Sequence, residues 1–277
     1  MSSIYHTPVL LQSVIGYLNI KKGEKYIDAT LGGGGHGIEI VRKGGKVLGI
    51  DVDEESVGYV GRKWKVETGS WKLVRGNFKD LGEIARSNGF KKVSGIIFDL
   101  GVSSHQLETE ERGFSFQKDA PLDMRMNSSA DEQAVTAADL INGLTRKELY
   151  ELFTKLGEEQ FAGPISDSII GARQIKPIAT TGQLAKAVGD VYKKYHMKRG
   201  KINPATKVFQ ALRMAVNDEL NNLRQALPQA LDLLLPGGRL VVISFHSLED
   251  RIVKNFAKEQ QALVLARILT DKPVTPD

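Results

Sequence analysis

Apolar and polar residues alternate along the first hundred positions in a pattern that predicts strands separated by amphipathic helices. Four short apolar runs have the length and composition of strands: 25–28, 46–50, 71–75 and 93–98. Amphipathic segments at 37–43 and 54–66 separate the first three of these runs. Because strands alternate with helices, the pattern favours a parallel sheet with crossover helices. The fourth run is almost wholly apolar, as expected of a strand covered on both faces.

The alternation stops after position 107, and the hydrophobic pattern from about 131 to 199 is helical. Two segments inside it, Thr145-x-x-Glu148 and Thr180-x-x-Gln183, have the form of a capping box before an apolar run. This part of the chain is therefore predicted to be a helical insertion in the sheet domain.

A further apolar run at 239–243 predicts a buried strand that returns the chain to the sheet, and Ser247-x-x-Asp250 predicts the cap of the helix after it. The sequence thus predicts an α/β fold in which a discontinuous sheet domain is interrupted by a mainly helical domain. The predicted bounds are 1–107 and 214–277 for the sheet domain and 108–213 for the insertion.

The composition is that of an ordinary soluble protein of one large or two modest domains: 277 residues, 41% hydrophobic and 26% charged. The formal net charge of +5 permits an anionic partner without requiring one. The absence of cysteine excludes disulfides, thiolate metal sites and cysteine nucleophiles, and fits a reducing compartment. No stretch resembles a signal peptide or reaches the ~18 apolar residues of a membrane span. We therefore expect a cytoplasmic protein, and no metal site is predicted.

A glycine-rich loop follows the first predicted strand. The strand ends at Asp28, and five of the next nine residues are glycine. A strand, a glycine loop and a helix in this order bring backbone N–H groups close to a ligand. No Gly-Lys-Ser/Thr follows, so the loop is not a Walker phosphate loop. The same glycines would also serve a tight turn with no ligand, so the loop alone leaves both interpretations open.

Asp51 ends the second predicted strand, nineteen residues after Gly32. This is close to the roughly 20-residue spacing of an acid that binds the ribose of a nucleotide cofactor. Asp51 could instead cap the following helix, but Asp53 is better placed for that cap. We therefore favour Asp51 as a ligand of an adenosine-containing cofactor.

Two more side chains follow strands at the same edge of the predicted sheet. Phe78 comes just after the third strand, where it would either wall a purine pocket or fill the core. Asp99 ends the fourth strand, which places it beside the glycine loop at the topological switch point. Because burying a carboxylate without a partner is costly, we expect Asp99 to have a functional role.

Residues 191–217 contain no acid, although they carry seven cations. Tyr192, Tyr195 and His196 are interleaved with these cations. Unopposed cations mixed with stacking side chains suit a nucleic-acid backbone, whereas a solvated helix face is the usual alternative. We favour the nucleic-acid interpretation. The candidate substrate-binding residues are Lys193, Lys194, Lys198, Arg199, Lys201 and Lys207; Arg213 is the seventh cation.

Several motifs together resemble one family. They are His6-x-Pro8-Val9-Leu10-Leu11, Asp28-x-Thr30-x-Gly32-x-x-Gly35-His36-Gly37, Asp99-Leu100-Gly101-Val102-Ser103-Ser104-x-Gln106-Leu107, Glu111-Arg112-Gly113-Phe114-Ser115-Phe116, Pro121-Leu122-Asp123-Met124-Arg125-Met126, Asn203-Pro204-Ala205-Thr206 and Ser244-Phe245-His246-Ser247-Leu248-Glu249-Asp250-Arg251. They are similar to those of the bacterial ribosomal RNA small-subunit methyltransferase H family, also called MraW. That family methylates the exocyclic N4 of a cytosine in the decoding region of 16S ribosomal RNA, and the resemblance covers nearly the whole chain.

The resemblance implies a class I, Rossmann-like methyltransferase sheet, S-adenosylmethionine as the cofactor and a helical insertion for substrate recognition. The partner it implies is small-subunit ribosomal RNA, within an assembled or late-assembling subunit. Carried over by motif, the cofactor contacts fall on Gly34, Gly35, His36, Asp51, Phe78, Asp99 and Gln106.

Asp99 is also the candidate catalytic group. The amino nitrogen of cytosine is a poor nucleophile because its lone pair is delocalised into the ring, and an acceptor for its hydrogens would restore lone-pair character. Asp99 would be that acceptor, or it would serve the cofactor instead. Other amino-methyltransferases have Asn/Asp-Pro-Pro-aromatic where this chain has Asp-Leu-Gly-Val, and His246 and Arg125 are further candidates, each with a structural hydrogen bond as the alternative role.

Three other functions share part of this pattern. A dinucleotide oxidoreductase would share the glycine loop and Asp51, but no second nucleotide-binding half follows the fourth strand. A DNA amino-methyltransferase would share the chemistry and differ in the substrate domain. A non-catalytic RNA-binding module would keep the basic segment but would not need the glycine loop or the acids at the strand ends.

Overall fold

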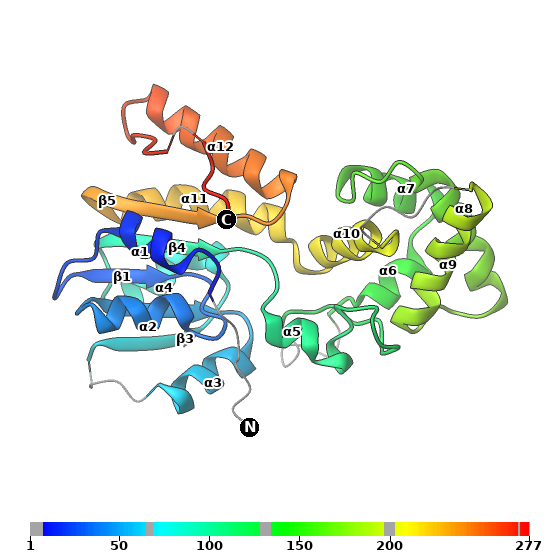
Figure 1. Cartoon of the computed structure of the whole chain (residues 1–277), viewed down its shortest axis with the longest axis horizontal. Helices are drawn as coiled ribbons and strands as arrows, with labels where there is room; N and C mark the ends of the chain where they lie inside the picture. Colours follow the sequence, from blue (N-terminus) through cyan, green and yellow to red (C-terminus); the bar gives the residue numbers. More distant parts are fainter. Residues whose placement is uncertain (1–7, 65–68, 128–133, 197–202, 271, 277) are drawn as a thin grey trace. The chain divides into compact units, whose positions relative to one another are not determined.

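Five parallel strands form one sheet in the order β3-β2-β1-β4-β5 (Figure 1). The strands are β1 (Lys25–Asp28), β2 (Lys46–Asp51), β3 (Trp71–Arg75), β4 (Val93–Asp99) and β5 (Leu234–Ile243). The structure is a computed structural model, and it describes residues 8–64, 69–127, 134–196, 203–270 and 272–276. β1 lies at the centre of the sheet. The chain first adds β2 and β3 on one side of β1, and later adds β4 and β5 on the other side. The predicted α/β, Rossmann-like sheet is confirmed.

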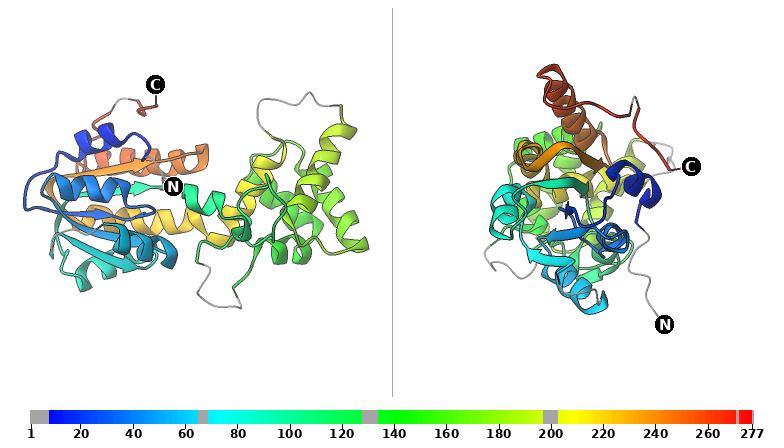
Figure 2. Two further views of the ribbon diagram at one scale, coloured as in Figure 1. Left: turned by 60° about the horizontal axis from the view of Figure 1, so that its bottom comes forward. Right: turned by 90° about the vertical axis from the view of Figure 1, so that its left-hand side faces the viewer.

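Helices lie on both faces of this sheet (Figure 2), and an apolar cluster packs against each face. On one face, Leu48 and Phe98 pack with residues of α4 (Leu81–Ser87) and α11 (Glu219–Leu233). On the other face, Tyr26 and Ile97 pack with residues of α1 (Leu11–Leu18) and α2 (Gly35–Arg42). The sheet unit also contains α3 (Glu54–Lys63), η1 (Phe78–Asp80) and α12 (Ser247–Ala262). Burial on both faces explains why the strands are continuous apolar runs.

The last strand differs from the prediction in length and burial. It pairs with β4 first at Leu234 and again from Arg239, so the residues between them interrupt the register. Most of β5 is only partly buried, because it is the edge strand of the sheet. The cap of α12 also differs by one residue: the His246 side chain, not that of Ser247, accepts the backbone N–H of Glu249.

The chain divides into two compact units, Met1–Ser103 with Leu220–Asp277, and Ser104–Glu219. We call them the sheet unit and the helical unit. The helical unit contains α5 (Ser104–Glu108), η2 (Glu110–Arg112), α6 (Ala137–Gly143), α7 (Arg146–Lys155), α8 (Ala162–Ile175), α9 (Thr181–Lys194) and α10 (Ala205–Asn217). Both predicted capping boxes are present, at Thr145 and at Thr180.

The unit bounds are wider than the predicted insertion of 108–213, for two physical reasons. At the first boundary, α5 packs against η2. At the second, α10 runs on to Asn217, whose side-chain amide bonds the N–H of Met126 and the carbonyl of Met124. Asp218 then leaves the helix in the left-handed region at φ 51°. Within the described residues, no helix is both long enough and apolar enough to cross a membrane.

The Thr145 capping box offers a test of local helix stability. The Thr145 hydroxyl accepts the Glu148 N–H, and the Glu148 carboxylate accepts the Thr145 N–H at 2.7 Å. Thr145→Ala should lower the free energy of unfolding by about 1 kcal/mol, as is typical for a lost N-cap. Thr145→Ser keeps the hydroxyl and is the matched control. Equal stability of the two variants in urea unfolding would contradict the role of the cap.

Candidate functional site

Three carboxylates lie at the carboxyl ends of adjacent strands in the sheet unit. Asp28 ends β1, Asp51 ends β2 and Asp99 ends β4. The two neighbours of β1 are β2 and β4, so the switch point of the sheet lies between β1 and β4. In open α/β sheets, ligands bind outside the carboxyl ends of the strands at such a point. The glycine loop that follows Asp28 lies at the same edge.

Asp51 holds the glycine loop. Its Oδ2 accepts the N–H of Gly32 at 2.7 Å, and its Oδ1 accepts the N–H of Asp53 at 2.8 Å. Asp53 is the N-cap of α3 and accepts the N–H of Glu55 at 3.1 Å, so the cap belongs to Asp53, as predicted. Each carboxylate oxygen has a second lone pair that a ribose hydroxyl could use. Ribose binding by Asp51 therefore stays a prediction.

Gly34 and Gly35 are required by packing. Gly34 has φ 76°, and a Cβ there would lie 3.0 Å from a methyl of Val60. A Cβ at Gly35 would lie 2.1 Å from Cγ of Pro8. The loop leads into α2, whose first turn has backbone N–H groups that no helical carbonyl can accept and that favour an anion. A cofactor contact by Gly34 and Gly35 would thus come from the backbone, and it remains a prediction.

His36 lies between a backbone carbonyl and the Asp99 carboxylate. Its Nε2 is 3.1 Å from the carbonyl oxygen of Val9, and its Nδ1 is 3.6 Å from Oδ2 of Asp99. A carbonyl oxygen only accepts, so in the neutral ring the proton is on Nε2 and Nδ1 presents a lone pair to Asp99. Nδ1 and Oδ2 would then be two acceptors facing each other. The arrangement favours a proton between them, on the carboxyl group or on the ring.

Asp99 is anchored by its backbone and has an unsatisfied side-chain oxygen. Its N–H donates to the Thr30 hydroxyl at 2.6 Å, which ties the end of β4 to the loop after β1. Its Oδ1 is buried and has no hydrogen-bond partner among the described residues. Burial raises the pKa of Asp99 to about 7, and the nearby Glu249 carboxylate acts in the same direction. A carboxyl group that exchanges its proton near neutral pH can act as an acceptor in catalysis.

Asp28 is a site residue that the sequence reasoning did not assign. It is only 1% exposed, and burial raises its pKa to about 7. The charges of Asp99 and Asp51 also raise this pKa, while hydrogen bonds from the backbone of Thr30 and Gly37 lower it. An acid at the end of an apolar strand is the signal that singled out Asp99, and it applies equally to Asp28.

The other predicted cofactor residues lie in packed surroundings. Phe78 packs edge-on against Phe98 in the core, with ring centroids 5.7 Å apart. Gln106 is buried on α5 in the helical unit. The contacts of both with a cofactor stay predictions. His246 caps α12, and Arg125 forms a two-pronged pair with Asp123 at 2.7 and 2.8 Å. Each residue therefore makes the structural hydrogen bond that was the alternative to a catalytic role.

We call the acid-free stretch 191–217 the basic segment. More of its cations have partners than the sequence suggests. Lys193 pairs with Asp190 at 3.2 Å, one residue before the acid-free stretch, and Arg213 forms a two-pronged pair with Glu219, just after it. Lys207 donates to the carbonyl of Glu158. Lys194 is exposed at the end of α9. The remaining candidates, Lys198, Arg199 and Lys201, lie outside the described residues.

Two of the interleaved aromatic residues pack within the helical unit. The rings of Tyr192 and Tyr195 lie 5.1 and 5.6 Å from that of Phe161. The hydroxyl of Tyr192 donates to Glu159 at 2.8 Å, and burial together with this carboxylate raises the pKa of Tyr192. Tyr192 is therefore held by the fold, whereas Tyr195 remains 48% exposed.

A glycine loop and carboxylates at the switch point of a parallel sheet are typical of Rossmann-like enzymes that use a nucleotide cofactor. The chain belongs to the MraW methylase family, whose model matches residues 3–276. This confirms the family that the motifs indicated.

Relatives in this family match along most of their length. The ribosomal RNA small subunit methyltransferase H of Persephonella marina is 45% identical, over 99% of this chain and 92% of the relative. The protein of the same name from Thermomicrobium roseum is 45% identical, over 99% of this chain and 88% of the relative. That from Carboxydothermus hydrogenoformans is 40% identical, over 98% and 91%.

The buried acid Asp28 makes stability depend on pH. In the unfolded chain it ionises near its ordinary pKa of about 4, while in the folded chain it stays protonated up to about 7. Between these values the folded state binds more protons, so the free energy of unfolding falls as pH rises, by at most about 1.4 kcal/mol per pH unit. Asp28→Asn removes this titration, so the free energy of unfolding of this variant should fall less steeply as pH rises.

Urea unfolding at several pH values between about 4.5 and 7 measures this slope. Glu259→Gln, which changes an exposed acid on α12, is the control and should keep the slope of the unaltered protein. Identical slopes for Asp28→Asn and the unaltered protein would show that Asp28 does not titrate in this range.

Proposed function

We propose that this protein transfers a methyl group from S-adenosylmethionine to the exocyclic N4 of a cytosine in the decoding region of small-subunit ribosomal RNA. Membership of a methylase family supports the reaction class, and the names of the relatives support ribosomal RNA rather than DNA as the substrate. The structural observation that carries the proposal is Asp99, a partly buried carboxylate at the switch point whose buried Oδ1 has no hydrogen-bond partner among the described residues.

The residues at the carboxyl edge fit this cofactor. Asp51 would accept hydrogen bonds from the ribose hydroxyls, and the first turn of α2 would donate to the carboxylate of the methionine part. When bound, S-adenosylmethionine supplies an electrophilic methyl group on a positively charged sulfur. Ionisation of Asp28 and Asp99 near pH 7 would add negative charge at this edge, which favours such a cation. Phe78, His36 and Gln106 complete the proposed set of cofactor residues.

Asp99 would act on the amine during the transfer. When the N4 nitrogen takes up the methyl group that the cofactor would supply, one proton must leave the nitrogen. The free Oδ1 of Asp99 would accept the hydrogen bond from the amine and then the proton. His36 lies 3.6 Å from the other oxygen, where a proton between the two groups would link them. Alignment of the two reactants could supply up to about 7–11 kcal/mol in the best cases.

The proposed substrate is a macromolecule, so part of its recognition would lie away from the reacting atoms. A target cytosine must be unpaired or flipped out to expose its amino group. The helical unit would recognise the surrounding RNA within an assembled or late-assembling small subunit. The cytoplasmic location predicted from the sequence belongs to the same proposal, because ribosomal RNA is its substrate.

Methyl transfer to undermethylated small ribosomal subunits tests the function, with duplex DNA as the competing substrate and NAD as the competing cofactor. Asp99→Asn should lower the single-turnover rate by two orders of magnitude or more, or about 2.7 kcal/mol of barrier, because an acceptor oxygen becomes a donor. The rate of the unaltered protein should rise about tenfold per pH unit up to the Asp99 pKa of about 7 and then level off, since the acceptor must be ionised.

Cofactor affinity separates the two roles of Asp99. If affinity holds while the rate falls, the carboxylate acts on the amine; if affinity is lost in parallel, Asp99 is a cofactor ligand. Near-normal turnover of Asp99→Asn at saturating cofactor and RNA would overturn both roles. Transfer to DNA but not to ribosomal subunits would overturn the proposed substrate.

The basic segment should contact RNA phosphates. Replacing Lys194, Lys198 and Arg199 with Gln should weaken binding of small subunits and leave cofactor affinity unchanged. The slope of log affinity against log salt should fall by about 2, since each lost phosphate contact removes about 0.7–0.9.

The control removes three exposed lysines elsewhere in the helical unit, Lys147, Lys155 and Lys176, by the same change to Gln. An unaltered salt slope in the first variant, or an equal fall of the slope in both variants, would show that the basic segment is an ordinary solvated surface.

A further inference from the structure

The amino edge of the sheet, opposite the strand ends that carry Asp28, Asp51 and Asp99, is rich in lysine. The chain segments that enter β1 to β4 bring exposed lysines to this edge. We call this set the lysine edge: Lys25, Lys43, Lys46, Lys72, Lys91 and Lys92. The candidate site described above uses none of these residues.

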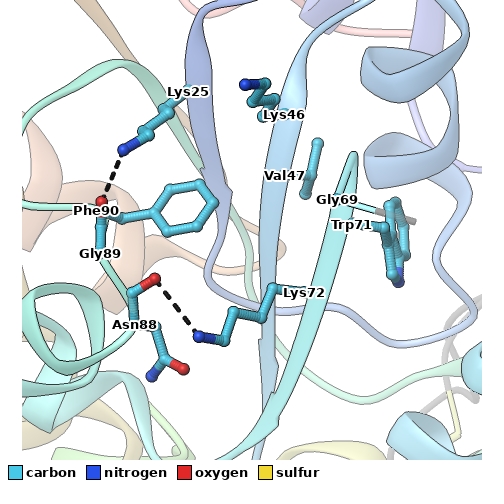
Figure 3. A pocket seen from close by; sticks show the side chains of 9 residues that line it. All are labelled: Lys25, Lys46, Val47, Gly69, Trp71, Lys72, Asn88, Gly89 and Phe90. Atoms are coloured by element: carbon cyan, nitrogen blue, oxygen red, sulfur yellow. Dashed lines mark hydrogen bonds between the residues drawn. The ribbon is translucent and has the colours of Figure 1, made fainter. Parts of the chain in front are cut away.

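The strand register gathers three of these lysines on one face. Lys25 and Lys46 are direct partners on neighbouring parallel strands, so their side chains emerge on the same face. Lys72 on β3 is the partner of Leu48, two residues after Lys46, and therefore points to that face as well. Figure 3 shows the three side chains around a hollow of about 330 Å³ that Phe90 also lines.

Three of the six ammonium groups are held by uncharged partners. Lys25 donates to the carbonyl of Gly89 at 2.7 Å and Lys72 to that of Asn88 at 3.5 Å, both at the end of α4 (Figure 3). Lys92 likewise donates to the carbonyl of Asp232. A carbonyl oxygen fixes the position of an ammonium group but carries no counter-charge, and each ammonium keeps two further donors. The positive charge is therefore positioned without being neutralised.

Several surface lysines on helices elsewhere in the protein are compensated by carboxylates. Lys155, Lys186 and Lys254 each lie within 3.1 Å of a carboxylate oxygen one helical turn away. Among the described residues, no carboxylate lies within ion-pairing distance of the six lysines of the lysine edge. A solvated face typically mixes both signs of charge, as those helices do. Like charges collected on one edge repel each other, and a polyanion would relieve that repulsion.

We infer that the lysine edge is a second binding surface for the phosphate backbone of the RNA substrate; this inference rests on the proposed function. The contact is electrostatic and independent of base sequence, because ammonium groups neutralise phosphates and release their counterions. It lies at the opposite edge of the sheet from Asp99. It therefore contributes to RNA affinity and to KM, and it leaves the rate of methyl transfer at saturating RNA unchanged.

The test replaces Lys43, Lys46 and Lys91 with Gln, since none of the three side chains donates a described hydrogen bond that the fold would lose. The slope of log affinity for small ribosomal subunits against log salt should fall by about 2. KM for the subunits should rise about tenfold or more, while the single-turnover rate at saturation and the affinity for S-adenosylmethionine stay unchanged. The triple variant of Lys147, Lys155 and Lys176 is matched in charge and should have neither effect.

Acetylation of lysine amines, read by mass spectrometry with and without bound subunits, tests the contact directly in the unaltered protein. Bound RNA should protect Lys46 and Lys43 and leave Lys147 reactive. An unchanged salt slope together with unprotected Lys46 would overturn the inference, and so would equal effects in both triple variants. Failure of the unaltered protein to methylate small subunits would instead overturn the proposed function, so the two failures are distinguishable.

Discussion

Burial of the parallel sheet on both faces is the constraint on which the rest of the structure depends. Apolar side chains from α4 and α11 cover one face, and those from α1 and α2 cover the other. Along the buried central strands, polar groups can then reach solvent or a ligand only where the strands begin or end. The result is an electrostatic polarity along the strands, with carboxylates at the carboxyl edge and lysines at the amino edge. Both candidate surfaces of the sheet unit follow from this single constraint.

The carboxyl edge departs from what stability alone would favour. Asp28 and Asp99 end neighbouring strands, and burial raises the pKa of both to about 7. Such acids oppose folding at neutral pH, and an apolar pair of the same size would remove that cost. A fold that keeps two of them beside a glycine loop retains the chemistry at the expense of stability, as is common at functional sites.

The sequence predicted those elements whose signals are local. The first four strands match within one residue, and both capping boxes formed, because an apolar run or a Thr-x-x-Glu pattern acts within a few positions. The predictions that differ from the structure concern contacts with residues that are distant along the chain or that lie just outside the segment considered. Lys193 and Arg213 each pair with a carboxylate that lies just outside the acid-free stretch. β5 is only half-buried because, among the described residues, no further strand covers its outer edge.

Positions of charge could be read from the sequence, but their compensation could not. A lysine bonded to a carbonyl and a lysine paired with a carboxylate look identical in sequence, yet only the first keeps its full field. Lys25 and Lys193 illustrate the difference: a backbone oxygen of Gly89 holds one, and the other pairs with the Asp190 carboxylate, which Lys186 shares. The +5 net charge of the chain is therefore an incomplete guide to where RNA would bind. The partner of each ammonium group, which only the fold specifies, decides whether its charge is available to a phosphate.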